Sequence, residues 1–379
     1  MSEYPYALNL TFTASCKYGK KNYLSCNCFN GLFSIDEEGK IEHIGRFPNE
    51  TTFKRNIHHR AFVYDKKIFF VPGYGSSLAI YDPNTNVIES VNLGNLPSFR
   101  GMDSIVFEEN LWIFPADVNL FPICIDLKSM EVSYAEKYRE IVSEDIKKKG
   151  AIFNGTLSFD GKAAWASVWG THFLYKFDLE HREQQIIDIG DDSLCVAGVT
   201  YNNGNLYFTT LDDLSIFSFD INGKSIRKYS VDDIPLTERR LKYCNILSYK
   251  NQVIVLPETG EWILELDELE QRFSKKYRIP ETIFSVEDSC RTTWRRFLYY
   301  SIERNNLLIY PFKTNGSILI DLNDGEVSSE EFVFNKNDID YIFDQKYRTN
   351  ISKEILDKEI VKETYLINLE RFIEAVEES

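Results

Sequence analysis

Basic side chains gather in a few short segments of this chain, although the chain as a whole is acidic. A guanidinium group presents a planar set of donors that matches the geometry of a carboxylate or a phosphate. Converging segments could hold an acidic or phosphorylated sugar, a nucleotide sugar or an acidic peptide. The alternative is that these are solvated loop charges paired with local carboxylates. The candidate ligand-binding residues of this kind are Arg55, His58, His59, Arg100, Arg240, Arg291 and Arg295.

Three of these arginines, Arg100, Arg240 and Arg291, are the strongest candidates for an anion site. Two tryptophans, Trp169 and Trp262, stand near polar residues in expected loops. There the flat ring of a ligand could stack on an indole, or the indoles could instead pack between elements of the core. Both tryptophans therefore join the candidate ligand-binding residues.

Acid–base chemistry has weaker candidates. His172 could pair with Glu258 or Glu261, because a histidine titrates near neutral pH and can exchange a proton with a substrate. No spacing shows that these side chains meet, so the catalytic residues stay unknown.

A short pattern that recurs seven times indicates what must position these side chains. It reads apolar residue, any residue, apolar residue, aspartate, with 42 to 54 residues between successive aspartates. Self-similarity of this length is typical of a β-propeller built blade by blade. Each aspartate is expected to accept backbone hydrogen bonds in the turn that follows it. The aspartates are Asp36, Asp82, Asp126, Asp178, Asp220, Asp267 and Asp321.

Two further columns of residues mark strand ends in each repeat. An apolar run precedes most members of the first column, in which proline fits the end of a strand because it cannot donate to a ladder. These second-strand ends are Cys26, Pro72, Pro115, Val168, Thr210, Pro257 and Pro311. An aromatic residue closes an earlier strand in each repeat, at Tyr18, Tyr64, Phe107, Phe159, Tyr201, Tyr249 and Tyr300.

A fourth, polar strand follows each aspartate, so four strands repeat seven times. We therefore predict an all-β fold, a seven-bladed β-propeller with a C-terminal helical tail. The ring could close by face packing of its first and last blades, or by an N-terminal strand that completes the last blade. The predicted blades span about residues 7–48, 56–95, 99–142, 150–190, 194–232, 240–281 and 290–336.

The segment 337–379 loses the strand pattern and carries apolar residues at helical spacing. It is predicted to form a helix that docks on the propeller or binds a protein partner. The apolar residues are Tyr365, Leu366, Leu369, Phe372, Ile373 and Val376.

The repeats resemble those of kelch and galactose-oxidase-like propellers over about residues 7–334, although the glycine pair that usually ends the second kelch strand is missing. The resemblance rests on the second-strand run, the third-strand pattern and the repeat length. By analogy with propellers, a ligand site is expected at one mouth of the central channel. That mouth is formed by the loops from fourth to first and from second to third strands.

Composition excludes several classes of function. The chain has 379 residues and a formal net charge of -15, which argues against a nucleic-acid surface. No signal peptide and no apolar run long enough to span a membrane is recognised. Seven cysteines, with one close pair at Cys26 and Cys28, suit reduced thiols in a cytoplasmic, bacterial protein. Five histidines and no cofactor motif predict neither a metal centre nor a cofactor.

Three functions remain open. The first is a cytoplasmic propeller that binds an anionic small molecule, a glycan or a protein partner at one mouth of the channel. The second is an enzyme of the lyase, epimerase or mutarotase type, which would hold the carboxylate of an acidic sugar with arginine and use His or Glu as acid and base. The third is a structural subunit of an assembly.

Overall fold

A computed structural model describes most of the chain between residues 10 and 334. The described residues are 10–51, 54–94, 100–118, 120–134, 153, 157–190, 193–211, 215–232, 243–257, 262–280, 297–311 and 316–334. They form twenty-nine β-strands and no helix, so the all-β prediction is confirmed. No helix long and apolar enough to cross a membrane occurs in this part of the chain. The predicted helical tail, 337–379, lies outside the described residues.

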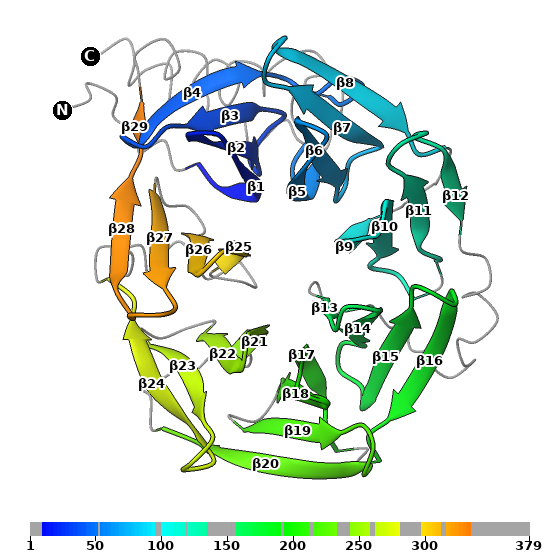
Figure 1. Ribbon diagram of the computed structural model, residues 1–379, viewed down its shortest axis with the longest axis vertical. Helices are drawn as coiled ribbons and strands as arrows, with labels where there is room; N and C mark the ends of the chain where they lie inside the picture. Colours follow the sequence, from blue (N-terminus) through cyan, green and yellow to red (C-terminus); the bar gives the residue numbers. More distant parts are fainter. Residues whose placement is uncertain are drawn as a thin grey trace, which may run out of the picture.

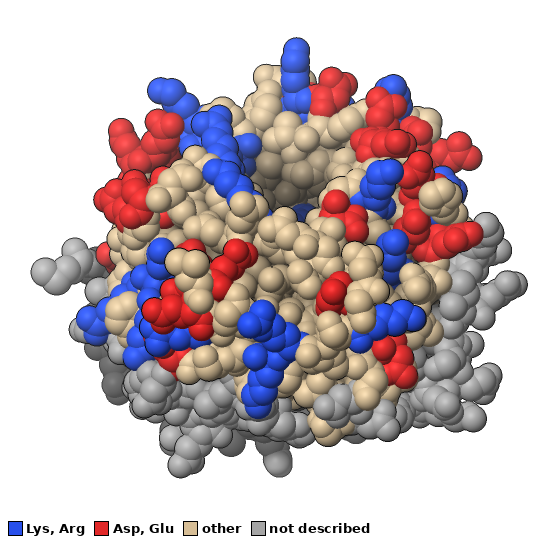
Figure 2. Space-filling view, turned by 60° about the horizontal axis from the view of Figure 1, so that its bottom comes forward, with Lys and Arg blue, Asp and Glu red and all other residues tan. Residues whose placement is uncertain are grey.

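The strands form four concentric layers around a central axis (Figure 1), and the space-filling view shows a hollow at the centre of one face (Figure 2). The innermost strands are β1 (Phe12–Tyr18), β5 (His58–Tyr64), β9 (Gly101–Phe107), β13 (Ser158–Phe159), β17 (Val196–Asn202), β21 (Tyr243–Tyr249) and β25 (Phe297–Glu303). The second layer is β2 (Lys21–Cys26), β6 (Lys67–Pro72), β10 (Asn110–Pro115), β14 (Ala163–Ser167), β18 (Asn205–Thr210), β22 (Gln252–Pro257) and β26 (Asn306–Pro311).

The third layer is β3 (Leu32–Ile35), β7 (Ser77–Asp82), β11 (Ile123–Asp126), β15 (Phe173–Asp178), β19 (Ile216–Asp220), β23 (Trp262–Asp267) and β27 (Gly316–Asp321). The outer layer is β4 (Lys40–Gly45), β8 (Val87–Asn92), β12 (Val132–Tyr134), β16 (Glu183–Asp188), β20 (Ser225–Val231), β24 (Arg272–Arg278) and β28 (Val327–Glu331). A last short strand, β29 (Val333–Phe334), follows β28. Four consecutive strands, one from each layer, are called a strand group below, from the first (β1–β4) to the seventh (β25–β28).

Hydrogen bonding joins the strands into six sheets. Five of them have the size of one propeller blade, with four strands each or, where β29 is added to the first group, five. The sixth sheet has eight strands and contains the fifth and sixth groups. These two antiparallel halves meet through a short parallel pairing, in which Ser230 and Val231 of β20 lie opposite Arg272 and Phe273 of β24. The arrangement is that of a β-propeller.

The repeated aspartates have the structural role predicted for them. Each carboxylate accepts the N–H of a residue two or three positions further on, at 2.7 to 3.0 Å. Hydrogen bonds of this kind stabilise the ionised form. The N–H of Asn84 accordingly lowers the pKa of Asp82, and the N–H of Ser129 lowers the pKa of Asp126. The most regular feature of the sequence therefore belongs to the scaffold.

The predicted strand ends agree with the structure to within one residue, except in the seventh group. The second-layer strands end at six of the seven predicted residues, and β14 ends one residue before Val168. The first-layer strand β17 ends one residue after Tyr201, and β25 ends at Glu303 instead of Tyr300. The last prediction was wrong because the hairpin turn is made by Arg304, with φ of 59°, and Asn305, so that Glu303 pairs with Asn306.

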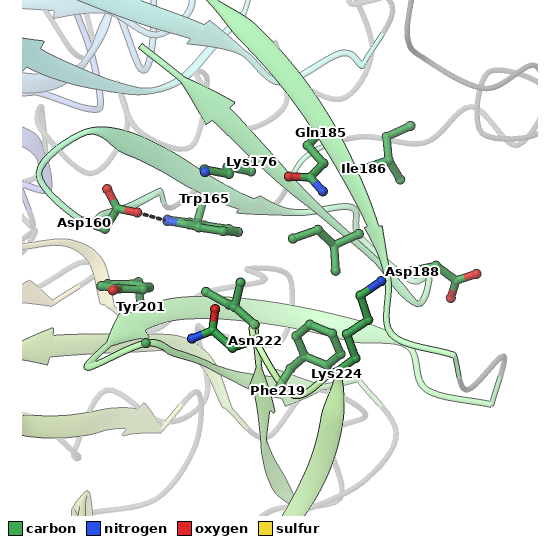
Figure 3. A pocket seen from close by; sticks show the side chains of 13 residues that line it. Asp160, Trp165, Lys176, Gln185, Ile186, Asp188, Tyr201, Phe219, Asn222 and Lys224 are labelled. Carbon is green, nitrogen blue, oxygen red and sulfur yellow. Dashed lines mark hydrogen bonds between the residues drawn. The ribbon is translucent and has the colours of Figure 1, made fainter. Parts of the chain in front are cut away.

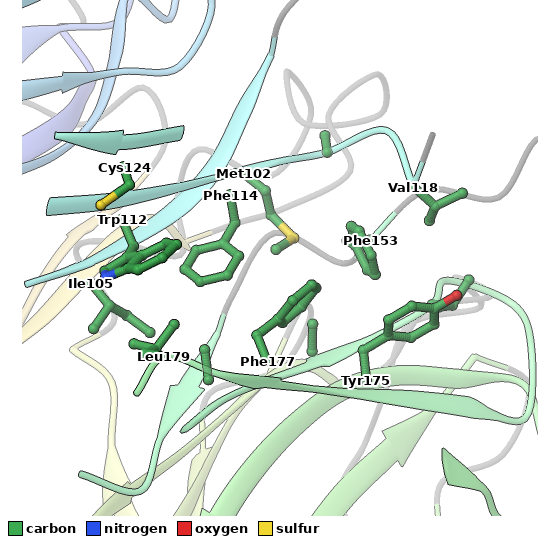
Figure 4. Close-up of a cluster of buried hydrophobic side chains, with 14 residues drawn as sticks. Met102, Ile105, Trp112, Phe114, Val118, Cys124, Phe153, Tyr175, Phe177 and Leu179 are labelled. Carbon is green, nitrogen blue, oxygen red and sulfur yellow. The ribbon is translucent and has the colours of Figure 1, made fainter. Parts of the chain in front are cut away.

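Buried apolar side chains between neighbouring groups hold the ring together. Each of seven hydrophobic clusters contains residues from two neighbouring strand groups. The cluster between the third and fourth groups is built on aromatic rings (Figure 4), with Phe114 5.0 Å from Phe177 and Phe153 5.0 Å from Tyr175 between ring centroids. Such contacts add to the stabilisation that burial itself provides.

The first and seventh groups pack against each other by the same means, which is one of the two closures expected from the sequence. Phe12 of β1 contacts Tyr310 of β26 and Phe332, with ring centroids about 6 Å apart. The Tyr299 hydroxyl donates to the carbonyl oxygen of Ser15 at 3.0 Å. In addition β29 pairs in parallel with β4, where Val333 lies opposite Lys40. The last described strand therefore joins the outer edge of the first group.

Candidate functional site

An ion pair links the innermost strands of the second and third groups. Arg60 in β5 and Asp103 in β9 each lie four residues before the aromatic residue that ends their strand. Arg60 Nη1 is 3.1 Å from Asp103 Oδ1 and also donates to the carbonyl oxygen of Ser104. The Asp103 side chain is 13% exposed, whereas that of Arg60 is 44% exposed. One edge of the guanidinium is thus held by β9 while the other remains accessible.

Asp103 is fixed by more than this arginine. Its Oδ1 accepts the N–H of Ser104 at 2.8 Å, and its Oδ2 accepts the N–H of Leu157 at 2.9 Å. The carboxylate therefore joins the third and fourth groups as well. The charge of Asp103 also raises the pKa of Arg60. Tyr299 and Tyr300 of the seventh group raise it further. Arg60 is a permanent cation whose guanidinium is held by two residues of β9.

His59 lies beside this ion pair with one fixed tautomer. Its Nδ1 is 2.8 Å from the carbonyl oxygen of Pro72, which can only accept, so Nδ1 carries the proton and Nε2 is an acceptor. Burial lowers the pKa of His59 to about 4, although Asp103 opposes the shift. The backbone of β9 can approach Pro72 and His59 closely because residue 101 is a glycine. A Cβ there would lie 2.2 Å from the Pro72 oxygen and 3.0 Å from the His59 ring. The imidazole is therefore neutral at pH 7.

His58 faces the first strand group, away from His59, at a point where the pairing of β5 with β6 shifts register. Its Nδ1 is 2.9 Å from Ser25 Oγ, and its ring lies 4.2 Å from that of Phe47. It is almost fully buried, and burial lowers its pKa well below the usual value. His58, predicted as a ligand-binding residue, is thus placed in the core between the first two groups.

The remaining basic candidates divide into two sets. Arg100 directly precedes β9, and its guanidinium lies over the ring of Tyr74 at 4.8 Å from the centroid, a cation–π contact. Arg55 is exposed in the segment before β5. Both lie, with the start of β5 and β9, on the side of the ring where the fourth-to-first loops emerge. Arg240, Arg291 and Arg295 are outside the described residues.

The other candidates belong to several strand groups, and two of them are not described. Trp169 is partly buried in the connection between β14 and β15, and Trp262 packs against the cluster between the fifth and sixth groups. His172 Nε2 is 3.7 Å from Asp188 Oδ1, whose side chain is 61% exposed. Glu258 and Glu261, the predicted partners of His172, lie outside the described residues. No cluster of three or more potential metal ligands occurs in the part of the chain that the structure describes.

Acidic and basic side chains are interspersed around the hollow at the centre of the face seen in Figure 2. The described residues of that face therefore form no wide patch of a single charge sign. The charged feature with fixed geometry is the ion pair of Arg60 and Asp103, which sequence reasoning did not join. Its signal was the shared position of the two residues, four before the strand end in neighbouring repeats.

Comparisons with known proteins give the fold. No family model matches the sequence, and no curated protein matches it. A catalytically inactive virginiamycin B lyase from Staphylococcus aureus with quinupristin matches with a TM-score of 0.57 and 12% identity, over 80% of this chain and 92% of that chain. A streptogramin B lyase matches with a TM-score of 0.51 and 15% identity, over 73% and 82%. The computationally designed Ika8 protein matches with a TM-score of 0.54 and 8% identity, over 86% and 89%.

At these identities the three likenesses establish a β-propeller and no shared activity. The resemblance to kelch repeats is not confirmed by them.

Proposed function

We propose that this protein is a recognition propeller that binds an anionic group at the channel mouth where β5 and β9 begin. The observation that carries the proposal is Arg60, whose guanidinium is anchored through Nη1 and whose side chain is 44% exposed. An arginine has five N–H donors in a rigid fork. Within the described residues only those on Nη1 are engaged, so the far edge can receive two oxygens of a carboxylate or phosphate.

Neighbouring residues support an anion at this place. Asp103 is held by two backbone N–H groups and Arg60, so its carboxylate is already satisfied. Arg100 adds a second cation at the same mouth. The occupant would be an acidic small molecule, a glycan or an acidic segment of a protein partner, met in the cytoplasm.

We further infer that each half of the eight-stranded sheet is one blade, which makes seven. A buried cluster between the halves, including Ile216 of β19 and Val255 of β22, supports this division. Every other pair of neighbouring groups packs through a cluster of the same kind. The propeller fold also carries a small-molecule ligand in the lyase with quinupristin, which supports a ligand site without naming the ligand.

The test is a thermal-shift screen against acidic sugars, sugar phosphates, nucleotide sugars and simple carboxylates, at low and high salt. A ligand that binds only the folded state raises the melting temperature. Each hit is then titrated calorimetrically against Arg60→Lys, Arg60→Gln and Arg100→Ala. Arg60→Lys keeps the charge but removes the fork, so a bidentate anion should bind at least tenfold more weakly to it.

Arg227→Gln is the matched control, because Arg227 lies on the outer strand β20 over the ring of Tyr229. It should leave binding unchanged. The proposal is wrong if no compound binds, or if the hits bind the Arg60 and Arg100 variants within twofold of the wild type.

A further inference from the structure

A groove lies between the fourth and fifth strand groups, away from the mouth described above. Its cavity volume is about 440 Å³, within the range of roughly 300 to 1,000 Å³ typical of small-molecule sites. It is bordered by β16 of the fourth group and by the hairpin turns of the fifth group, at Gly204 and Asn222 (Figure 3). Hairpin turns lie on the opposite side of the ring from the loops that precede β5 and β9. The groove is therefore a separate site.

The carboxylates that line the groove are occupied by donors of the protein. Asp160 Oδ1 accepts the N–H groups of Lys162 and Ala163 at 2.9 and 2.7 Å, and its Oδ2 accepts the indole N–H of Trp165 at 2.8 Å. Asp188 Oδ1 accepts the N–H of Gly190 at 2.7 Å and lies near His172. Both carboxylates therefore already accept hydrogen bonds from the protein, and both keep their negative charge.

Two lysines of the groove have no such partner. Lys176 comes from β15 and Lys224 from the turn before β20. Within the described residues neither ammonium group has a carboxylate within 4.0 Å. Lys176 Nζ instead lies 5.6 Å from the centre of the Trp165 ring. The groove is thus lined by two lysines and two aspartates, with each ammonium group more than 4.0 Å from the carboxylates.

The wall below Lys176 is flat and apolar. Trp165 is almost fully buried, and the hydrogen bond to Asp160 fixes the plane of its indole. The ring of Tyr201 lies parallel to it, with centroids 6.0 Å apart and an interplanar angle of 5°. In Figure 3 the indole lies between Lys176 and Tyr201. Tyr201 is only partly buried, so it offers a ring surface to the groove.

We propose that this groove binds a small organic anion that carries a flat ring, with a carboxylate or a phosphate as its charged group. The ring packs against Tyr201 and the apolar wall, and the anion is held between Lys176 and Lys224. The two ammonium groups, neither of which has a carboxylate within 4.0 Å, favour this class over a neutral ligand. The inference is independent of the site at Arg60.

Two pairs of probes separate the ring from the charge and the carboxylate from the phosphate. Indole-3-acetate is compared with indole-3-acetamide, and adenosine monophosphate with adenosine, by isothermal titration at 50 mM and 500 mM salt. We expect at least one charged probe to bind ten times more tightly than its neutral counterpart, and to weaken at high salt. Whichever pair responds identifies the charged group.

Variants then locate the bound probe. Lys176→Gln combined with Lys224→Gln should weaken binding of the charged probe at least tenfold and leave the neutral probe unchanged. Lys20→Gln, which removes the same charge from an exposed turn of the first group, should have no effect. The proposal is overturned if no probe binds at 5 mM, if charged and neutral probes bind equally, or if the double variant binds as well as the Lys20→Gln control.

Discussion

Side chains connect neighbouring innermost strands in two parts of the ring, and the chemistry of the connection differs between them. Between β5 and β9 it is the ion pair of Arg60 and Asp103, 3.1 Å apart. Between β13, β17 and β21 it is a chain of hydroxyl groups, in which Ser158 Oγ lies 3.3 Å from Thr200 Oγ1 and Thr200 Oγ1 donates to Ser248 Oγ at 3.2 Å. Backbone groups join the chain too, because Ser158 Oγ accepts the N–H of Tyr201.

The comparison shows that small neutral groups are sufficient to connect innermost strands. A charged pair in the same role must first lose hydration, which offsets much of its attraction. Ring closure therefore does not require the charge at β5 and β9. The difference marks Arg60 and Asp103 as the part of the wall whose chemistry exceeds what the scaffold needs.

Removing Asp103 should have the largest effect on stability. Asp103→Ala removes the counter-charge of Arg60 and the acceptor for the N–H of Leu157, and we expect the free energy of unfolding in urea to fall by about 3 to 4 kcal/mol. Asp103→Asn keeps one acceptor oxygen, so its free energy of unfolding should decrease by about half as much. Equal stability of the alanine variant and the wild type would mean that the charged joint contributes nothing to the ring.

The neutral His59 should make stability depend on pH. Its folded pKa of about 4 lies below the unfolded value of about 6.5, so the folded state binds fewer protons in between. The neutral imidazole therefore lowers the stability of the fold only when it must resist protonation. Above pH 6.5 stability is unaffected, and as the pH falls toward 4 the free energy of unfolding decreases by about 2 to 3 kcal/mol. Urea unfolding between pH 7 and pH 4.5 should show a smaller decrease for His59→Gln than for the wild type. Parallel curves for the two proteins would contradict the assignment.

A cut in the hydroxyl chain should have a moderate effect. Ser158→Ala removes the acceptor for the N–H of Tyr201 and the contact with Thr200. We expect a decrease of about 1 to 2 kcal/mol in the free energy of unfolding, less than for Asp103→Ala. A loss as large as that at Asp103 would remove the distinction between the two joints.

An ion pair on the outside should have the smallest effect. Lys162 Nζ lies 3.5 Å from Glu180 Oε2, with side chains 78% and 53% exposed. Because water and salt screen such pairs, Lys162→Ala should change stability by less than about 0.5 kcal/mol. A larger change would show that position in the channel is not what gives the Arg60 pair its weight.

The sequence predicts the scaffold well because each strand group repeats the same local physics. An aspartate that caps the turn after the third strand acts on its own neighbours, so its role can be read without the fold, and Asp82 and Asp126 show this directly. The error at Tyr300 arose where the spacing within one repeat changes.

The site was harder to predict because it depends on contacts between repeats. Arg60 and Asp103 are far apart in sequence, and only alignment of their repeats places them at equivalent positions. The groove left no signal at all, since Lys176 and Lys224 belong to different groups and no spacing links them. Whether Arg240 and Arg291 join the mouth is a prediction that the described residues do not test.

The short parallel pairing of β29 with β4 has a mechanical consequence. Six of the seven joints between strand groups are crossed by the chain itself, so force pulling them apart is borne by covalent bonds. Among the described residues no chain segment links the first and seventh groups covalently in this way. There the backbone of Val333 and Phe334 holds the two groups together by pairing with β4. Under load we expect the ring to open at this seam first, because the contacts that hold it there are noncovalent.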